Sequence, residues 1–172
     1  VDLSRNWNSH WGGFGASFNP VDNNFIGPGP FSEPETRSLS RFVESISDRL
    51  FGYISFRGFG QRLLIPFAHT TEHKQNYDQM IVIGRRAMGS LSVRYGTLYR
   101  VGTSGEVHDG VTGTAADWVK ASFNTSLVLT YQLRDEGRSG FAINPREVLP
   151  NCEEVFDSIL ALLREGRIIN LI

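Results

Sequence analysis

Helix-type and strand-type hydrophobic patterns alternate along this chain, and that alternation limits the folds open to it. Apolar residues repeat at helical spacing in three segments: Leu39–Leu50, Tyr77–Tyr95 and Cys152–Arg164. Residues typical of strands concentrate in three others: Phe51–Phe56, Gln61–Phe67 and Ser126–Leu133. Such alternation favours helices packed against a sheet whose strands are mainly parallel. We therefore predict an α/β fold with a mixed, mostly parallel sheet and flanking helices.

Three segments lack a hydrophobic period and are predicted to be loops. The first thirty residues are rich in Gly, Asn, Pro and aromatic residues, a composition typical of a long surface segment that builds a site. Gly102–Gly113 contains four glycines and is predicted to be a mobile loop, followed by a short helix over Ala115–Ser122. Gly137–Pro145 is predicted to be the third loop.

Charge and cysteine content exclude several classes of protein. The chain has 172 residues, with 17 Lys and Arg against 18 Asp and Glu, so its formal net charge is −1. Neither nucleic acid nor an anionic membrane is expected as a partner, because general binding to either needs a basic excess. A single cysteine, Cys152, excludes an internal disulfide framework. No apolar run is long enough to span a bilayer.

Two short motifs carry little weight by themselves. His69–His73 matches the H-x-x-E-H pattern of metalloproteases, which requires both imidazoles on one helical face. The segment directly follows Pro66–Ala68 and contains two threonines, so we predict a loop with two solvated histidines. Asn124-Thr125-Ser126 is a sequon for N-glycosylation, and the alternative is an unmodified turn.

Charged residues at two strand ends are candidates for a site. Arg134 and Asp135 follow the last predicted strand. Charged residues at this place either line a cleft or form a structural ion pair, and from these two residues alone we favour the ion pair. Arg57 ends another strand and is followed by Gly58 and Gly60, which allow the backbone a close approach. Arg57 is either a functional residue or an ordinary surface arginine.

Taken together, many segments resemble the zinc metallocarboxypeptidases of the pancreatic A/B type, in the order of that family and over nearly the whole chain. The resemblance implies the metallocarboxypeptidase fold. It covers only the C-terminal half of the family's catalytic domain, so residues 1–172 are assigned to that half and the N-terminal half is absent. The matching segments are Val1–Trp7, Gly15–Ser17, Gly27–Pro28, Pro30–Glu35, Tyr53–Phe56, Gln61, Leu63–Pro66, Asp117–Trp118, Gln132–Asp135, Gly137, Gly140–Phe141, Pro150 and Glu153–Glu154.

The resemblance also implies that two groups needed for catalysis are replaced. Arg57 takes the position of the family's third zinc ligand, a histidine, and a guanidinium has no lone pair to donate. Gln132 takes the position of the general-base glutamate, and an amide cannot deprotonate water. Asp109 falls near the mobile tyrosine of the family. Ser4 replaces the Asn of the family's Asn-Arg pair, whereas Arg5 keeps its Arg.

Substrate-binding positions are carried over in the same way. Arg5 is expected to hold a terminal carboxylate, with Ser4 beside it. Ala116 takes the position of the specificity residue at the base of the pocket, and it is small and neutral. With Ala68 and Thr130, these residues imply a preference for apolar side chains.

The resemblance therefore predicts a catalytically inactive homologue with no bound zinc. It either binds peptide C-termini without cleaving them or serves a structural or storage role. The alternative is a zinc-dependent carboxypeptidase that removes apolar C-terminal residues once its N-terminal half completes it. The expected partner is that N-terminal half, from the same precursor, or a second copy of the chain. If that half keeps its zinc-ligand Glu, Arg57 is expected to pair with it. The expected location is a secretory compartment or the extracellular space.

Overall fold

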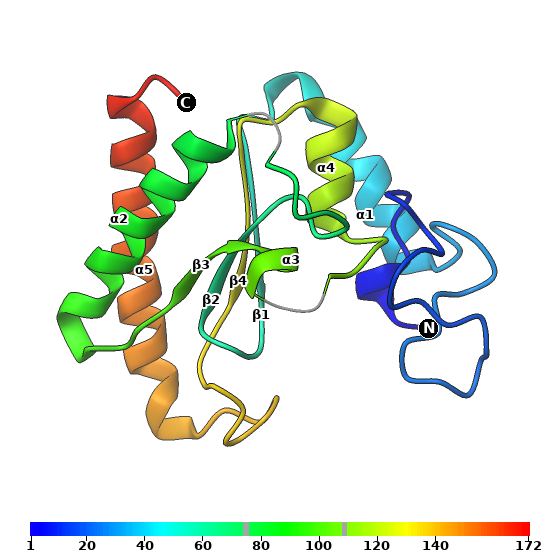
Figure 1. Ribbon diagram of the computed structural model, residues 1–172, viewed down its shortest axis with the longest axis horizontal. Helices are drawn as coiled ribbons and strands as arrows, with labels where there is room; N and C mark the ends of the chain where they lie inside the picture. Colours follow the sequence, from blue (N-terminus) through cyan, green and yellow to red (C-terminus); the bar gives the residue numbers. More distant parts are fainter. Residues whose placement is uncertain (74–75, 108–109) are drawn as a thin grey trace. The chain divides into compact units, whose positions relative to one another are not determined.

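The computed structural model describes residues 1–73, 76–107 and 110–172, and the chain divides into two compact units (Figure 1). The first unit comprises Val1–Tyr53, Pro66–Glu72 and Thr103–Val128. The second unit comprises Ile54–Ile65, His73–Gly102 and Leu129–Ile172. Among the described residues, no helix is long and apolar enough to cross a membrane.

A four-stranded sheet runs in the order β1-β4-β2-β3, and most of its residues belong to the second unit. Its strands are β1 (Gly52–Arg57), β2 (Arg62–Ile65), β3 (Arg100–Thr103) and β4 (Leu127–Gln132). β2 pairs with β4 in the antiparallel sense. β1 and β4 run parallel, because the amides of Leu127 and Leu133 bond to the carbonyl oxygens of Phe51 and Arg57 with the same offset. The predicted mixed, mostly parallel sheet with flanking helices is confirmed.

In the second unit, helices α2 (Tyr77–Tyr95) and α5 (Pro145–Ile168) lie side by side (Figure 1). The inward face of α2 agrees with the prediction except at Ile81, which is only half-buried. Gly84 lets the helix approach the sheet, since a Cβ there would lie 2.9 Å from Cγ1 of Val101. The helix ends at Gly96 in the left-handed conformation, as predicted.

Helix α5 begins seven residues earlier than predicted, so the loop expected over Gly137–Pro145 ends where the helix starts. The Asn144 side chain accepts a hydrogen bond from the Arg146 amide at 3.0 Å, and Pro145 occupies the first turn. Residues 145–149 are exposed. This stretch therefore carries no hydrophobic period from which a helix could be predicted.

Ion pairs from Arg86 and Arg94 join α2 to α5, and we expect acidification to weaken them. Arg94 Nε lies 2.8 Å from Asp157 Oδ2, and Arg86 Nη1 lies 2.5 Å from Glu165 Oε2. The hydrogen bonds from Arg94 and Arg86 lower the pKa of Asp157 and of Glu165. A lowered pKa in the folded state stabilises the fold above the pKa of the unfolded chain. That contribution is lost as the pH falls from about 5 to about 3.

Urea denaturation across this range should show the free energy of unfolding falling with pH. This dependence on pH should be weaker in the R86Q/R94Q double variant. An unchanged dependence would contradict the assignment of the stabilisation to these ion pairs.

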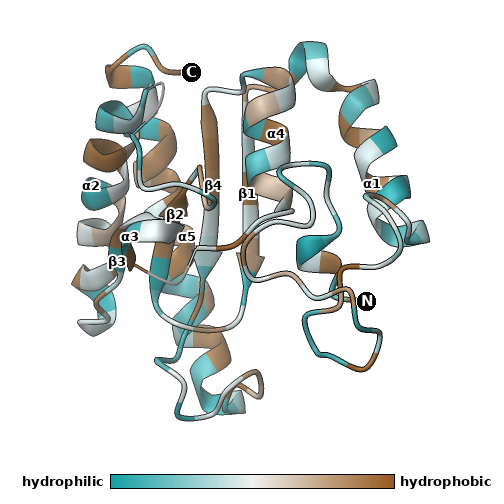
Figure 2. Cartoon of the chain, turned by 45° about the vertical axis from the view of Figure 1, so that its right-hand side comes forward, coloured by the Kyte–Doolittle hydropathy of each residue, from teal (hydrophilic) through white to brown (hydrophobic). Residues whose placement is uncertain are grey.

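The first unit packs around aromatic side chains from distant parts of the sequence. Its elements are the 3-10 helices η1 (Leu3–Arg5) and η2 (Ser47–Arg49) and the helices α1 (Pro34–Ser45), α3 (Ser104–Val107) and α4 (Ala115–Phe123). Trp7 lies against Trp118 with ring centroids 5.3 Å apart, and Phe31 packs edge-on against both indoles. Val43, Val119 and Val128 complete this core. Figure 2 shows hydrophilic residues alternating with the apolar ones along α1.

The predicted apolar face of α1 is wrong at Leu39 and Phe42 and confirmed at Val43. Leu39 and Phe42 are 44% and 58% exposed, whereas Thr36, Ser40 and Val43 are buried. The buried face is fixed by a polar contact, because the Thr36 hydroxyl donates to Asn6 Oδ1 at 2.7 Å. The helix also stops at Ser45, short of Leu50.

The long N-terminal segment is ordered by polar contacts at one buried residue. Asn6 is fully buried, and its amide nitrogen donates to the Ile26 and Gly29 carbonyls and to Ser32 Oγ at 2.7, 3.0 and 2.9 Å. With Thr36, four separate positions are held by a single side chain. This explains how a segment without a hydrophobic period adopts one conformation.

The region predicted to be a mobile loop over Gly102–Gly113 contains regular structure. β3 ends at Thr103 and α3 follows directly, capped by Thr103 and Glu106, whose carboxylate accepts from the Thr103 amide at 2.7 Å. Both elements are only four residues long, which is too short for a periodic signal. Asn124 of the sequon is exposed in the left-handed conformation at the end of α4.

Candidate functional site

In the second unit, three polar residues form a row across neighbouring strands. Gln132 at the end of β4 pairs with Arg62 at the start of β2. On the other side, the Leu133 amide bonds to the Arg57 carbonyl at 2.8 Å, which in a parallel ladder places Arg57 opposite Gln132. Residues that lie opposite each other point to the same face of a sheet. Arg57, Gln132 and Arg62 therefore share one face.

The neighbouring positions confirm this orientation. Phe56 stacks on Tyr131 with ring centroids 5.2 Å apart, one residue before Arg57 and Gln132 on their strands. The Tyr131 hydroxyl lies 3.0 Å from Ser158 Oγ of α5, and burial raises its pKa to about 12. Because side chains alternate along a strand, this aromatic pair occupies the opposite face of the sheet.

The side chain of Gln132 is only 3% exposed, and it is held in one orientation. Arg62 Nη1 donates to its Oε1 atom at 3.2 Å. Gly60 leaves room for this contact, since a Cβ there would lie 2.9 Å from that oxygen. Arg62 Nε is itself buried and has no hydrogen-bond partner among the described residues. Half-buried Thr130 lies two residues before Gln132 on the same face of β4.

Arg5 and Ser4 belong to the first unit, in the 3-10 helix η1. Asp2 caps this helix and binds both residues: its Oδ2 lies 2.9 Å from Arg5 Nε, and its Oδ1 accepts from Ser4 Oγ at 2.6 Å. Arg5 Nη1 donates to the Gly15 carbonyl at 3.0 Å. The guanidinium is half-buried, and its Nη2 atom has no hydrogen-bond partner among the described residues. The Nη2 end of the Arg5 guanidinium therefore remains available to donate to an anion.

Ala68 and Ala116 also lie in the first unit and are connected through Asp117. The Asp117 carboxylate is 1% exposed and accepts from the Ala68 amide at 2.9 and 3.1 Å. Ala116, its neighbour on α4, is half-buried against the aromatic core. A buried carboxylate with hydrogen-bond donors on both oxygens fixes the backbone around these two small residues.

His69–His73 is a loop, as predicted, but His69 is not solvated. Its Nδ1 atom lies 3.3 Å from Asp117 Oδ2, its side chain is 14% exposed, and its ring stacks on His10 at 3.6 Å. His73 instead stacks on Tyr77 at 3.7 Å. The two histidines of the motif therefore do not face one another. Within the described ranges, no group of three His, Cys, Asp or Glu side chains could hold a metal ion.

The structure thus groups the predicted residues within each unit. Ser4 and Arg5 share Asp2, and Ala68 joins Ala116 through Asp117, all in the first unit. Arg57, Thr130 and Gln132 belong to the second. Asp109 lies outside the described residues. Sequence reasoning missed Arg62, although its place one residue after Gln61 in a predicted strand could have indicated its face.

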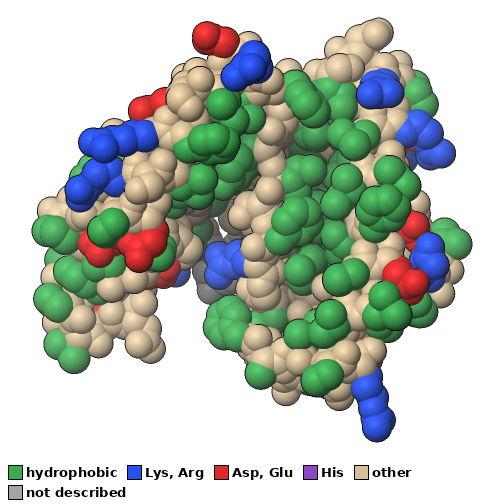
Figure 3. Space-filling model, turned by 180° about the vertical axis from the view of Figure 1, so that it is seen from behind, with side chains coloured by type: hydrophobic (Ala, Val, Ile, Leu, Met, Phe, Trp, Pro, Cys, Tyr) green, Lys and Arg blue, Asp and Glu red, His purple; other side chains and the backbone are tan. Residues whose placement is uncertain are grey.

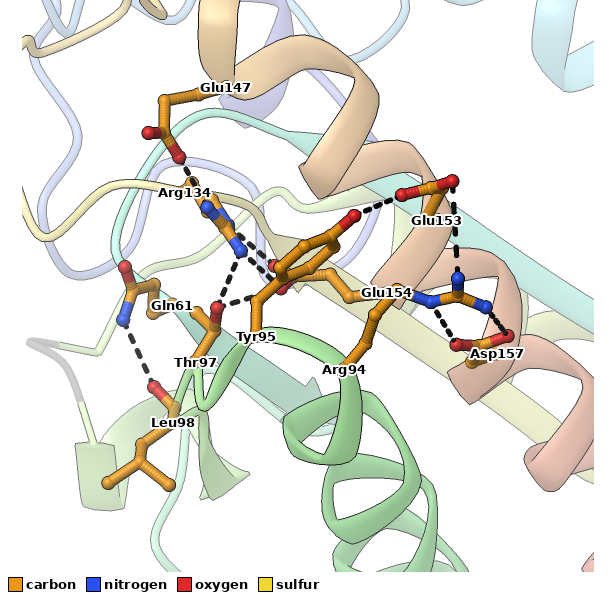
Figure 4. Close-up of polar contacts among 10 residues, drawn as sticks. All are labelled: Gln61, Arg94, Tyr95, Thr97, Leu98, Arg134, Glu147, Glu153, Glu154 and Asp157. Atoms are coloured by element: carbon orange, nitrogen blue, oxygen red, sulfur yellow. Dashed lines mark hydrogen bonds and ion pairs between the residues drawn. The ribbon is translucent and has the colours of Figure 1, made fainter.

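Arg134 forms the ion pair that the sequence favoured, but not with Asp135 (Figure 4). It binds Glu154 of α5, whose side chain is fully buried, and also bonds to Glu147 and to Thr97 Oγ1. These contacts raise the pKa of the Arg134 guanidinium, chiefly through the hydrogen bond to Glu154. Asp135 accepts instead from the Gly137 and Ser139 amides at 2.7 and 3.0 Å. Arg134 therefore fixes the end of β4 two residues after Gln132.

Comparison with known proteins gives consistent matches. The family model described as zinc carboxypeptidase matches residues 1–158. Human carboxypeptidase O is 36% identical over 163 residues, which is 95% of this chain and 43% of that protein. Zinc carboxypeptidase A 1 of Anopheles gambiae is 38% identical over 168 residues, 96% of this chain and 39% of that protein. The chain thus spans less than half the length of these relatives.

Solved structures agree on the fold. The structure of bovine thrombin-activatable fibrinolysis inhibitor in complex with tick carboxypeptidase inhibitor superposes with a TM-score of 0.92 at 24% identity. The match covers all of this chain and 58% of the solved one. The crystal structure of carboxypeptidase A from Helicoverpa armigera gives a TM-score of 0.87 over 96% of the chain, also at 24% identity. The metallocarboxypeptidase-like fold predicted from the sequence is confirmed.

Proposed function

Because this chain belongs to the zinc carboxypeptidase family, we propose that it is a homologue that binds peptide C-termini without hydrolysing them. The observation that carries this proposal is the burial and hydrogen bonding of Gln132. Where the family resemblance requires a general base, an amide is buried and its oxygen is engaged by Arg62. An amide in that position can neither accept a proton from water nor deliver one to a leaving group.

The residues at the metal position argue in the same direction. Arg57 replaces the ligand histidine, and its permanent positive charge opposes a divalent cation. The described residues therefore do not fit zinc at this position, and we propose no step that requires the metal.

Arg5 supports retained binding of a terminal carboxylate. Its Nε and Nη1 atoms are fixed by Asp2 and by the Gly15 carbonyl, so the guanidinium is positioned before a ligand arrives. The small side chains of Ala68 and Ala116 support a preference for apolar residues at the peptide end.

The decisive experiment uses the full-length protein with an N-acylated peptide that ends in phenylalanine, and with the corresponding C-terminal amide. We expect the acid to bind, the amide to bind less tightly, and mass spectrometry to detect no released phenylalanine even with added zinc. Replacing Arg5 with Met should weaken binding of the acid about tenfold to a hundredfold, because a hydrogen-bonded charge pair is lost. The control is R41M, which removes an exposed arginine of α1.

Each other result is informative. Release of phenylalanine would contradict the proposal and support a zinc-dependent carboxypeptidase. Equal binding of acid and amide, or no binding at all, would leave a structural or storage role.

We also propose that a further polypeptide covers part of this chain, either the N-terminal half of the same precursor or a second copy. Hydrophobic side chains gather on the face of the molecule shown in Figure 3. Large apolar residues are exposed in both units, among them Phe42 and Phe51 in the first and Leu149 and Phe156 in the second, all between 58% and 66%. Exposure on this scale is typical of a surface that another chain covers. A secreted location remains part of the proposal.

A further inference from the structure

We propose that Arg57, Gln132 and Arg62 form a binding site for a small oxyanion, of the carboxylate or phosphate class, on one face of the sheet. The proposal concerns the second unit alone and does not require that peptides bind at Arg5. It assigns a ligand to a row of residues in which Arg57 and Gln132 take two catalytic positions of the family.

The first argument is the unbalanced charge of the row. Two permanently charged guanidinium groups flank one amide, and among the described residues no ion pair includes Arg57 or Arg62. Arg62 Nε is buried and lacks a hydrogen-bond partner. A buried cationic donor without a partner is costly, because it loses hydration and gains nothing in return. An anion at this position would remove that cost.

The second argument is that the row offers donors on three strands. Arg62 Nη1 already engages Gln132 Oε1 at 3.2 Å, and this contact leaves the Gln132 Nε2 hydrogens to donate to a ligand. Arg57 is exposed at the end of β1, and among the described residues its side chain makes only one polar contact, from Nε to the Gly58 carbonyl at 3.5 Å. An arginine fork matches two oxygens of a carboxylate or phosphate.

The row also discriminates against other ligands. Two fixed positive charges repel metal cations, and the described residues place no carboxylate in the row to offset them. On the opposite face, Phe56 and Tyr131 fill the corresponding positions with stacked rings. The anion is therefore expected on the Arg57 face alone.

The test is titration of the full-length protein with inorganic phosphate at constant ionic strength, followed by calorimetry and by the melting temperature. We expect saturable binding, with a melting temperature that rises by about 3–6 °C at ten times the dissociation constant. The R62M and R57M variants should each lose this response. R62K, which keeps the charge but not the fork, should bind about tenfold more weakly.

The matched control is R85M, which removes an exposed arginine of α2 that lies outside the row and should respond as the unaltered protein does. An absent response in the unaltered protein, or a response in R62M and R57M as large as that of the unaltered protein, would overturn the proposal.

The two proposals can fail independently. Acetate and the peptide acid are each titrated into R62M and R5M. Loss of acetate binding in R62M indicates a free anion at the row, and loss of peptide binding in R5M indicates a peptide terminus at Arg5. Phosphate binding that depends on Arg62, without any peptide binding, would retain this inference and remove the proposed function.

Discussion

Replacing Arg134 with Met is expected to lower the free energy of unfolding by about 3–5 kcal/mol, because it leaves a buried carboxylate without its partner. Glu154 is fully buried, and Arg134 donates to both of its oxygens, with Thr97 as the remaining donor (Figure 4). Guanidinium chloride denaturation followed by circular dichroism measures this loss.

The reason for the loss can be tested by removing the carboxylate as well. The R134M/E154L double variant replaces the pair with apolar side chains, and such a replacement is often neutral. It should therefore recover most of the stability. R138M is the control, because this arginine lies in the same loop and is exposed, so its change in the free energy of unfolding should stay within about 0.5 kcal/mol. A double variant no more stable than R134M would show that Arg134 acts mainly through Glu147 or through the Tyr95 ring, whose centroid lies 5.6 Å from its Cζ atom.

Replacing Trp118 with Ala is expected to cost about 3–5 kcal/mol, the usual range for truncating a buried indole. Trp118 is 4% exposed and contacts Trp7, Phe31 and Phe123, with ring centroids between 5.1 and 5.4 Å apart. The loss should also loosen η1, because Trp7 follows Arg5 by two residues. Peptide binding at Arg5 should therefore weaken together with stability.

The comparison for Trp118 is F14A, which truncates an aromatic side chain that is 67% exposed in the same unit. Its effect should stay within about 0.5 kcal/mol. A loss below about 1 kcal/mol for W118A would mean that the aromatic cluster can collapse around the gap.

Most helices and strands were predicted from the sequence, including the short elements β1, β4 and α4, whereas β3, α3 and the start of α5 were not. α2 was predicted with its bounds, its buried face and its terminal Gly96, because nineteen residues repeat a clear pattern. β3 and α3 escaped prediction because four residues cannot show a period. The start of α5 escaped because residues 145–149 are exposed.

The candidate site shows the same division. Arg57 could be singled out because it ends a recognisable strand, and Gln132 because the family resemblance places it at the general-base position. Arg62 was missed; its place in a predicted strand could indicate its face, but only the register of β2 against β4 reveals that it lies opposite Gln132. The partner of Arg134 was also out of reach, because Glu154 lies twenty residues away on another element and only the structure brings the two side chains together.

The contacts of Asn6 make the order of the N-terminal segment depend on one side chain. One amide group secures the turns at Ile26 and Gly29 and the beginning of α1. Its removal would release all three stretches together. The segment is therefore expected to lose its order as a single unit rather than turn by turn.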